Sequence, residues 1–156
     1  MVVWRITSAR RVESAFSGEG AARSPGRWNH RHRRVVYTSD TPALAALEIL
    51  ANAETASALR DRVAIRAIVP DEEIYRMPSE DLPANWDSNP IGPRTRDLGE
   101  AWRADAAFLA LAVPSAVMPL QQNIIINPEH PSFRRVEIGD PIPIRFDPRL
   151  SGWNAG

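Results

Sequence analysis

The chain has 156 residues, 44% of them hydrophobic, and its 19 basic and 19 acidic side chains give a net charge of zero. This balance gives no support to nucleic-acid binding by bulk charge. No apolar run approaches the ~18 residues that a transmembrane helix requires, and the absence of cysteine excludes disulfides and thiolate metal sites. We therefore expect one globular domain over residues 1–156, located in the cytoplasm.

The first part of the chain predicts two strands and a helix. Val2–Ile6 has the short apolar character of a strand, and residues 17–29, rich in glycine, serine and alanine, indicate a loop. A second strand is expected at Val35–Thr38. The pair Thr41-Pro42 then predicts a helix start, with threonine as N-cap and proline at the first helical position. This helix is expected to end near Ala53.

The rest of the chain predicts more strands than helices. Residues 62–69 alternate as a half-buried strand does, whereas residues 78–96 contain several prolines and predict a long loop. A second helix is expected from Asp97 to about Ala112. Four short strands are expected after it, with a hairpin turn at Gly139-Asp140 between the last two: Ala116–Met118, Asn123–Ile126, Val136–Ile138 and Ile142–Phe146. The predicted class is α+β, without parallel βαβ alternation.

Three side chains at the ends of consecutive elements form the best candidate site: Arg27, Tyr37 and Glu48. Glu48 stands in an otherwise apolar run, 43–51, where a charge is costly unless it is paired or used. An arginine fork suits a pyrophosphate and an aromatic ring suits a heterocycle. A carboxylate can hold a ribose hydroxyl or stabilise an oxocarbenium-like charge. Spacing alone leaves the ordinary alternatives open, namely a surface arginine, a core tyrosine and a helix glutamate.

Other kinds of site have weaker support. His30 and His32 lie in an arginine-rich turn, residues 30–34, whose charge would repel a divalent ion, so no metal site is predicted. Gly18-Glu19-Gly20 lacks the third glycine of a dinucleotide fingerprint, and the absence of lysine excludes a phosphate loop. The basic turn could touch nucleic acid, but it has no interleaved aromatic residues. No direct nucleic-acid binding is therefore expected.

Several short motifs resemble, in the same order, those of the RES domain family. They are Arg5, Gly20-Ala21, Gly26-Arg27-Trp28-Asn29, Val36-Tyr37-Thr38-Ser39, Ala46-Leu47-Glu48, Gly99-x-x-Trp102, Val113-Pro114-Ser115-Ala116 and the segment 123–131. Their number and order make the match specific. The resemblance implies an ADP-ribosyltransferase-like fold, with a mixed or antiparallel sheet and a few flanking helices. It also implies the toxin of a type II toxin–antitoxin system that degrades NAD+ at the nicotinamide–ribose bond.

The resemblance further implies roles for single residues. Arg27 would bind the diphosphate, Tyr37 would line the nicotinamide pocket, and Glu48 would stabilise the ribosyl cation. Ser115 would match the family serine, among the catalytic residues. Arg5 would be a second anion contact, with Asn29 and Asn123 supporting the pocket. NAD+ would be the substrate, so no cofactor is expected.

The expected partner is an Xre-like helix-turn-helix antitoxin, and the chain could also form a homo-oligomer. Candidates for the antitoxin contact are the loop 78–96 and the basic turn 30–34. Two departures from the family pattern flank Arg27: Pro25 replaces the first of two glycines, and the basic turn replaces a small glycine-containing one. Two other functions stay open, namely transfer of ADP-ribose to a protein or to phosphate, and an inactive binding module.

Overall fold

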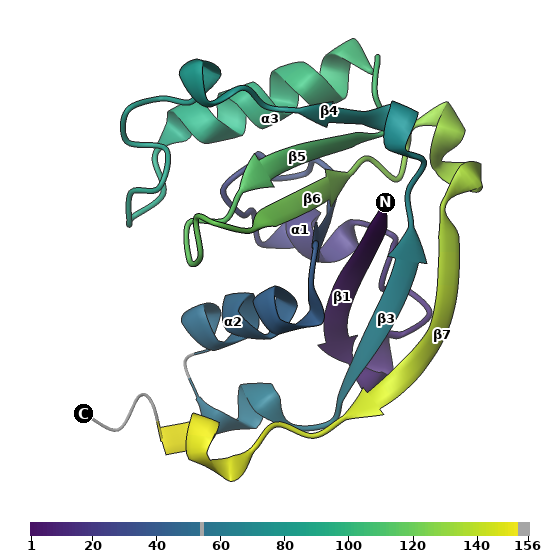
Figure 1. Cartoon of the computed structure of the whole chain (residues 1–156), viewed down its shortest axis with the longest axis vertical. Coiled ribbons are helices and arrows are strands. Elements are labelled where there is room, and N and C mark those ends of the chain that lie inside the picture. The colour runs from purple at the N-terminus through teal and green to yellow at the C-terminus, as the bar shows by residue number, and fades with distance from the viewer. Residues whose placement is uncertain (54, 153–156) are drawn as a thin grey trace.

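The fold is a single mixed sheet flanked by helices, shown by a computed structural model that describes residues 1–53 and 55–152 (Figure 1). The strand order is β4-β5-β6-β2-β1-β3-β7. The strands are β1 (Val2–Ser8), β2 (Val36–Ser39), β3 (Arg62–Ile68), β4 (Ile74–Arg76), β5 (Ala110–Pro114), β6 (Gln122–Ile126) and β7 (Glu137–Ile144). The α-helices within the described residues are α1 (Glu19–Arg23), α2 (Pro42–Asn52) and α3 (Pro93–Asp105). The predicted α+β class with a mixed sheet and few helices is confirmed.

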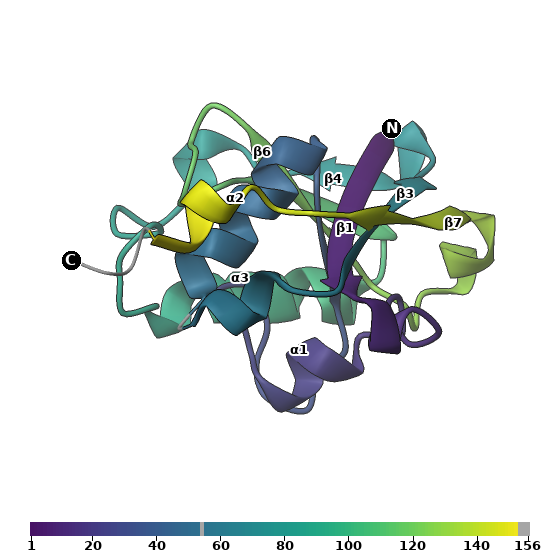
Figure 2. The ribbon, with the colours of Figure 1, turned by 90° about the horizontal axis from the view of Figure 1, so that it is seen from below.

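Short 3-10 helices connect several of these elements. They span Ala9–Arg11, Ala56–Leu59, Asp71–Glu73, Ser79–Asp81, Pro131–Arg135 and Pro148–Gly152. Among the helices of the described ranges, none is long and apolar enough to cross a membrane. Figure 2 shows α1 at one margin of the molecule and α2 beside β1.

The two faces of the sheet bury different apolar clusters, because successive side chains of a strand point to opposite faces. On one face, Ile124 and Ile126 of β6 pack in a cluster with Val3, Val36 and Ile65. On the other face, Ile125 packs with Trp28, Val35, Trp102, Leu111 and Val113, and Tyr37 lies against this cluster. Both faces of the central strands are therefore buried, and any polar side chain on them needs a partner.

The sheet divides at the junction of β1 and β2. β1 pairs with β3 along its whole length, whereas it pairs with β2 only through Trp4 and Ser39. β2 instead pairs with β6 over its four residues. Beyond Trp4 and Ser39 the two strands separate, and α2 packs against both of them (Figure 1).

The predicted bounds of the second helix were wrong at both ends. α3 begins at Pro93, inside the predicted loop, and ends at Asp105 with Ala106 in the left-handed conformation. The apolar run that follows forms β5 and pairs in parallel with the short β4, which was not predicted. A buried apolar run of five residues does not distinguish strand from helix by periodicity. The unit β4–α3–β5 is thus one parallel βαβ connection, which the sequence did not indicate.

Three smaller predictions also need correction. The expected strand Ala116–Met118 is a bend between β5 and β6, and the expected loop 17–29 contains α1. The expected hairpin at Gly139-Asp140 does not exist, because the chain continues as one strand along β3. Between the pairs Ile65–Pro141 and Ala67–Ile138, one residue of β3, Arg66, lies opposite two residues of β7, Gly139 and Asp140. The glycine therefore marks a β-bulge and not a turn.

Candidate active site

Helix α2 presents Glu48 at the divided region of the sheet. Its start is fixed as predicted, since the Thr41 hydroxyl accepts a hydrogen bond from the Leu44 amide at 3.1 Å and Pro42 occupies the first turn. Gln121, just before β6, donates from its amide to the same hydroxyl at 3.0 Å. Leu44 is fully buried, and Glu48, one turn later, is half-buried. These contacts fix the rotation of the helix about its axis, so that Glu48 faces β5 and β6.

One oxygen of the Glu48 carboxylate is held by two side chains. Glu48 Oε1 accepts a hydrogen bond from Ser115 Oγ at 2.8 Å and another from Asn123 Nδ2 at 2.5 Å. No hydrogen bond to Glu48 Oε2 is found among the described residues. Hydrogen bonds to a carboxylate are among the stronger ones in proteins. The arrangement orients the carboxylate and leaves Oε2 available for a ligand.

Ser115 acts here as a hydrogen-bond donor to Glu48. It is completely buried, directly after the end of β5. Its hydroxyl oxygen accepts hydrogen bonds from the amides of Val117 and Met118, both at 3.0 Å. A serine oxygen has two lone pairs and one proton, so the proton is left for Glu48. An oxygen with both lone pairs engaged is poorly suited to nucleophilic attack.

Asn123 is itself oriented by Ser39, a residue that the sequence analysis gave no role. Ser39 Oγ donates to Asn123 Oδ1 at 2.8 Å across the paired strands β2 and β6. With the carbonyl end of the amide occupied, the NH₂ end must point to Glu48. Ser39 follows Tyr37 by two residues on the same face of β2. That spacing was visible in the sequence, but the partner strand was not.

Tyr37 and Asn29 organise the turn that contains Arg27 and Trp28. The Tyr37 hydroxyl donates to Asn29 Oδ1 at 2.8 Å and accepts from the Trp28 amide at 2.9 Å. Asn29 is almost fully buried, and its Nδ2 donates to three backbone carbonyls, those of Ala21, His30 and Arg33. Burial raises the pKa of Tyr37, against the Trp28 hydrogen bond and two nearby arginines. Because the hydroxyl is already bonded twice, the half-buried ring is the part that a ligand could meet.

Arg27 is tied to the loop before α3. Its Nη1 donates to the carbonyls of Trp86 and Ser88, at 2.6 and 3.0 Å. Partial burial lowers the pKa of Arg27, while the negative charges of Asp87 and Glu48 oppose the shift. No partner for Nε or Nη2 is found among the described residues. One side of the guanidinium thus fixes the loop, and the other side remains available.

Arg5 lies between the separating strands. Trp4 and Ser39 pair, so Arg5 projects to the face opposite Ser39 and Tyr37. Its Nη1 reaches the Tyr37 carbonyl at 2.8 Å, and its Nε is buried without a partner in the described structure. Burial lowers the pKa of Arg5 to about 10. Its predicted role as an anion contact stays a prediction.

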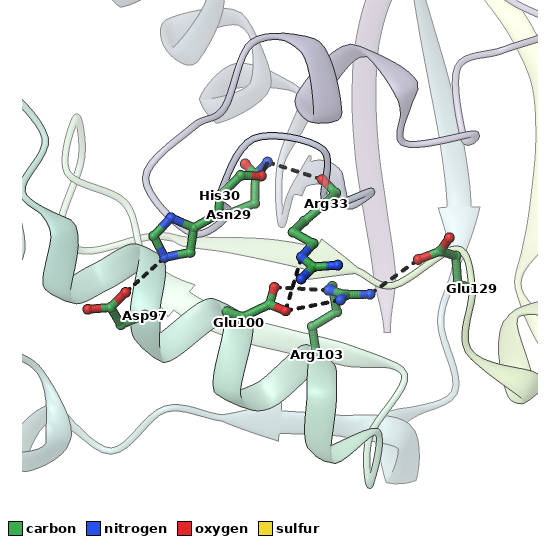
Figure 3. Close-up of polar contacts among 7 residues, drawn as sticks. All are labelled: Asn29, His30, Arg33, Asp97, Glu100, Arg103 and Glu129. Carbon is green, nitrogen blue, oxygen red and sulfur yellow. Dashed lines mark hydrogen bonds and ion pairs between the residues drawn. The ribbon is translucent and has the colours of Figure 1, made fainter.

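The basic turn 30–34 lies on α3, whose acidic side chains pair with part of it (Figure 3). His30 Nε2 is 2.8 Å from Asp97 Oδ1, and Arg33 Nε is 3.3 Å from Glu100. Glu100 also binds Arg103 at 3.0 Å, and the latter hydrogen bond lowers the pKa of Glu100. Arg34 also lies 3.8 Å from Glu19 of α1, so three of the five side chains of the turn form ion pairs. This pairing weakens the case for nucleic-acid contact.

The predicted residues thus form two adjoining groups and one outlier. Glu48, Ser115 and Asn123 form the first group, and Arg27, Asn29 and Tyr37 form the second. Within the described structure, Arg5 reaches the second group through a hydrogen bond to the Tyr37 carbonyl. A hollow of about 420 Å³ lies on another part of the surface, lined by Asp81, Leu82, Pro83, Arg94, Asp97 and Leu98. None of the predicted site residues lines it, so the candidate site is defined by its hydrogen bonds and not by the size of a hollow.

Comparisons with known proteins identify the family of the chain. The RES domain family model matches residues 2–147. The chain is 34% identical to Toxin Res of Yersinia enterocolitica, over 96% of this chain and 99% of the relative. It is 32% identical to the Prs ADP-ribosylating toxin of a Sphingobium species, over 94% of each chain.

Among solved structures, the M. tuberculosis MbcT–MbcA toxin–antitoxin complex contains a similar fold. The TM-score is 0.74 at 18% sequence identity, over 92% of this chain and 84% of that chain. This likeness concerns the fold, whereas the family rests on the sequence matches. The chain belongs to the RES domain family, together with the proteins named Toxin Res.

Proposed function

We propose that the protein is a toxin that cleaves the bond between nicotinamide and ribose in NAD+, with water as the acceptor. The observation that supports this most directly is the Glu48 carboxylate, whose Oε1 is held by Ser115 and Asn123. The negative charge of Glu48 also acts on Arg27 and on Tyr37, so both side chains lie near it. Acid, aromatic ring and arginine fork suit the ribose, the nicotinamide and the diphosphate respectively.

The reaction needs stabilisation of positive charge and little acid–base chemistry. The C1′–N bond breaks, and its electron pair leaves with nicotinamide as a neutral pyridine. Positive charge develops on the ribose, which the Glu48 carboxylate stabilises at close range. Water then forms the new C1′–O bond and releases a proton, giving ADP-ribose and nicotinamide. Ser115 and Asn123 keep the carboxylate in place, so that little reorganisation accompanies the change in charge.

Substitution of the acid tests this proposal. Glu48→Gln keeps the size of the side chain and its hydrogen-bonding capacity but removes the charge. We expect NAD+ consumption by the purified protein to fall by at least about 100-fold, with an unchanged far-UV spectrum. Glu13→Gln is the matched control, because Glu13 is exposed and has no hydrogen bond in the described structure. NAD+ consumption by Glu48→Gln at the wild-type rate would show that the mechanism is wrong.

Transfer of ADP-ribose to a protein is the second candidate function. The bend after Ser115 presents Val117, Met118 and Leu120 to solvent, and Leu120 is 94% exposed. An apolar rim beside the reacting carboxylate suits the docking of a protein acceptor. The Sphingobium relative is named an ADP-ribosylating toxin, which supports the same reading. NAD+ labelled in its adenosine part distinguishes the two functions, since transfer leaves the label on protein and hydrolysis leaves it on free ADP-ribose.

An antitoxin is the partner that this function requires. The solved complex with a similar fold is a toxin–antitoxin complex, and we propose the same kind of partner here, of the helix-turn-helix type. Expression of the chain alone should then arrest growth and lower cellular NAD+. Growth arrest with constant NAD+ would instead favour a binding role without catalysis.

A further inference from the structure

Arg96, on the first turn of α3, contacts the turn that contains Arg27. Its Nε donates to the carbonyl of Gly26 at 3.0 Å, and the side chain is half-buried. Gly26 in turn lies directly on Tyr37, because a Cβ atom added there would be 2.6 Å from the phenol oxygen. Arg96 therefore contacts Gly26, and Gly26 contacts Tyr37. This places a second guanidinium beside the site, on the same turn as the first.

The charge of Arg96 differs from that of its neighbours in having no acidic partner among the described residues. No ion pair of Arg96 is found in the part of the chain that the structure describes. The acid next to it, Asp97, is directed to His30 (Figure 3). Nearby Arg33 and Arg103, in contrast, are both paired with Glu100. An unpaired, half-buried arginine among paired ones suggests an anionic ligand.

Each of the two arginines is anchored to the protein by only part of its guanidinium group. Arg27 uses Nη1 for the loop carbonyls and Arg96 uses Nε for Gly26. Each guanidinium thus has one anchored side and further N–H groups for which the described structure contains no partner. Anchoring one side reduces the conformational freedom that ligand binding would otherwise remove. Both charges also act on the Tyr37 phenol, where they oppose the effect of burial on its pKa.

We propose that Arg96 is a second phosphate-binding residue of the site and that it binds the diphosphate of the dinucleotide together with Arg27. A diphosphate has two charged phosphates, and two guanidinium forks flanking one glycine can bind one phosphate each. The inference rests on the proposed function, since it assigns a ligand to the same site. It also explains why an arginine is anchored by its Nε, which leaves the Nη atoms for the ligand.

Binding measurements on a form that cannot turn over the substrate test the inference. Glu48→Gln is the parent, and NAD+ and nicotinamide riboside, which lacks the diphosphate, are the two probes in calorimetry. Arg96→Gln should weaken NAD+ binding by about tenfold, the usual size of a lost charge-assisted pair. Its affinity for nicotinamide riboside should not change. Arg96→Lys, which keeps the charge but not the fork, should weaken NAD+ binding less.

Arg94→Gln is the matched control, because Arg94 is exposed on the same helix and has no hydrogen bond or ion pair in the described structure. Equal NAD+ affinity in Arg96→Gln and the parent would overturn the inference while leaving the proposed function intact. An equal loss for both probes would overturn it too, because it would indicate a structural role for Arg96. A parent that binds no NAD+ at all would instead refute the proposed function.

Discussion

Ser115→Ala separates two possible roles of the serine, as a nucleophile or as a hydrogen-bond donor. The geometry favours the donor, because the hydroxyl oxygen already accepts from the Val117 and Met118 amides and the proton points to Glu48. The substitution removes one hydrogen bond to the carboxylate and leaves the one from Asn123. Glu48 is then less well fixed but still present. Activity should therefore fall without disappearing.

The expected loss of activity can be estimated from the hydrogen bond that the substitution removes. A hydrogen bond to a charged group contributes about 1.5–3 kcal/mol, which corresponds to about 10- to 100-fold in kcat. The remaining bond from Asn123 places the expected loss near the lower end. Stability should fall by about 1 kcal/mol, because the two orphaned amides belong to a partly exposed bend where water can replace the serine.

Steady-state NAD+ hydrolysis and urea unfolding measure the two effects. Ser14→Ala is the control, since Ser14 is exposed and its hydroxyl makes a single long hydrogen bond in the described structure, at 3.4 Å. We expect the KM for NAD+ to change little, because Ser115 has no free donor for the substrate. A loss of activity as complete as that of Glu48→Gln, or a covalent ADP-ribosyl adduct on Ser115, would refute the donor role.

Two further predictions concern stability. Gly99→Ala should destabilise the fold by more than about 3 kcal/mol in urea unfolding, because the new Cβ atom would lie 1.9 Å from the Trp28 carbonyl oxygen. Gly20→Ala is the control and should be neutral or slightly stabilising, because a Cβ atom at Gly20 would have no neighbour within 4 Å. Equal effects of the two changes would contradict this packing argument. The hydrogen bond from Arg103 lowers the pKa of Glu100 in the folded state. The Glu100 carboxylate therefore stabilises the fold at pH values above its ordinary pKa of 4.5, and this stabilisation is lost as the pH falls below 4.5. Glu100→Gln should therefore reduce the difference in unfolding free energy between pH 7 and pH 3.5, by about 1 kcal/mol or less at this partly buried pair. An unchanged difference would count against the ion pair.

Local signals in the sequence predicted the parts of the fold that local chemistry determines. The Thr41-Pro42 pair correctly placed the start of α2, and alternation correctly placed β3. β5 was missed because the run from Leu109 to Val113 is buried on both faces and shows no period that distinguishes it from a helix. The chain near Gly139 was misread because a glycine marks a bulge as readily as a turn. These errors concern elements whose conformation depends on distant partners.

The candidate site, too, was predicted from the sequence only in part. Glu48 stood out because a carboxylate in an apolar run needs a partner, and the structure supplies Ser115 and Asn123, 67 and 75 residues away. The family resemblance named both partners, whereas residue chemistry alone would not have chosen them. Ser39 was overlooked, because its role depends on the pairing of β2 with β6. Arg96 lay in a predicted loop and showed no signal until α3 placed it on Gly26.

The position of Glu48 against its partners depends on strand register more than on any single bond. Ser39 pairs with Asn123, and Asn123 pairs with Val113 on the next strand, so the three share one face of the sheet. The backbone bond from Ser115 to Gln121 extends this register by two residues, which returns Ser115 to the same face. A slip of one residue in either ladder would turn Asn123 or Ser115 away from α2. The bulky neighbours Ile124 and Ile125, buried on opposite faces, oppose such a slip. The apolar pattern of β6 therefore fixes the geometry of the carboxylate, even though none of its isoleucines touches the proposed substrate.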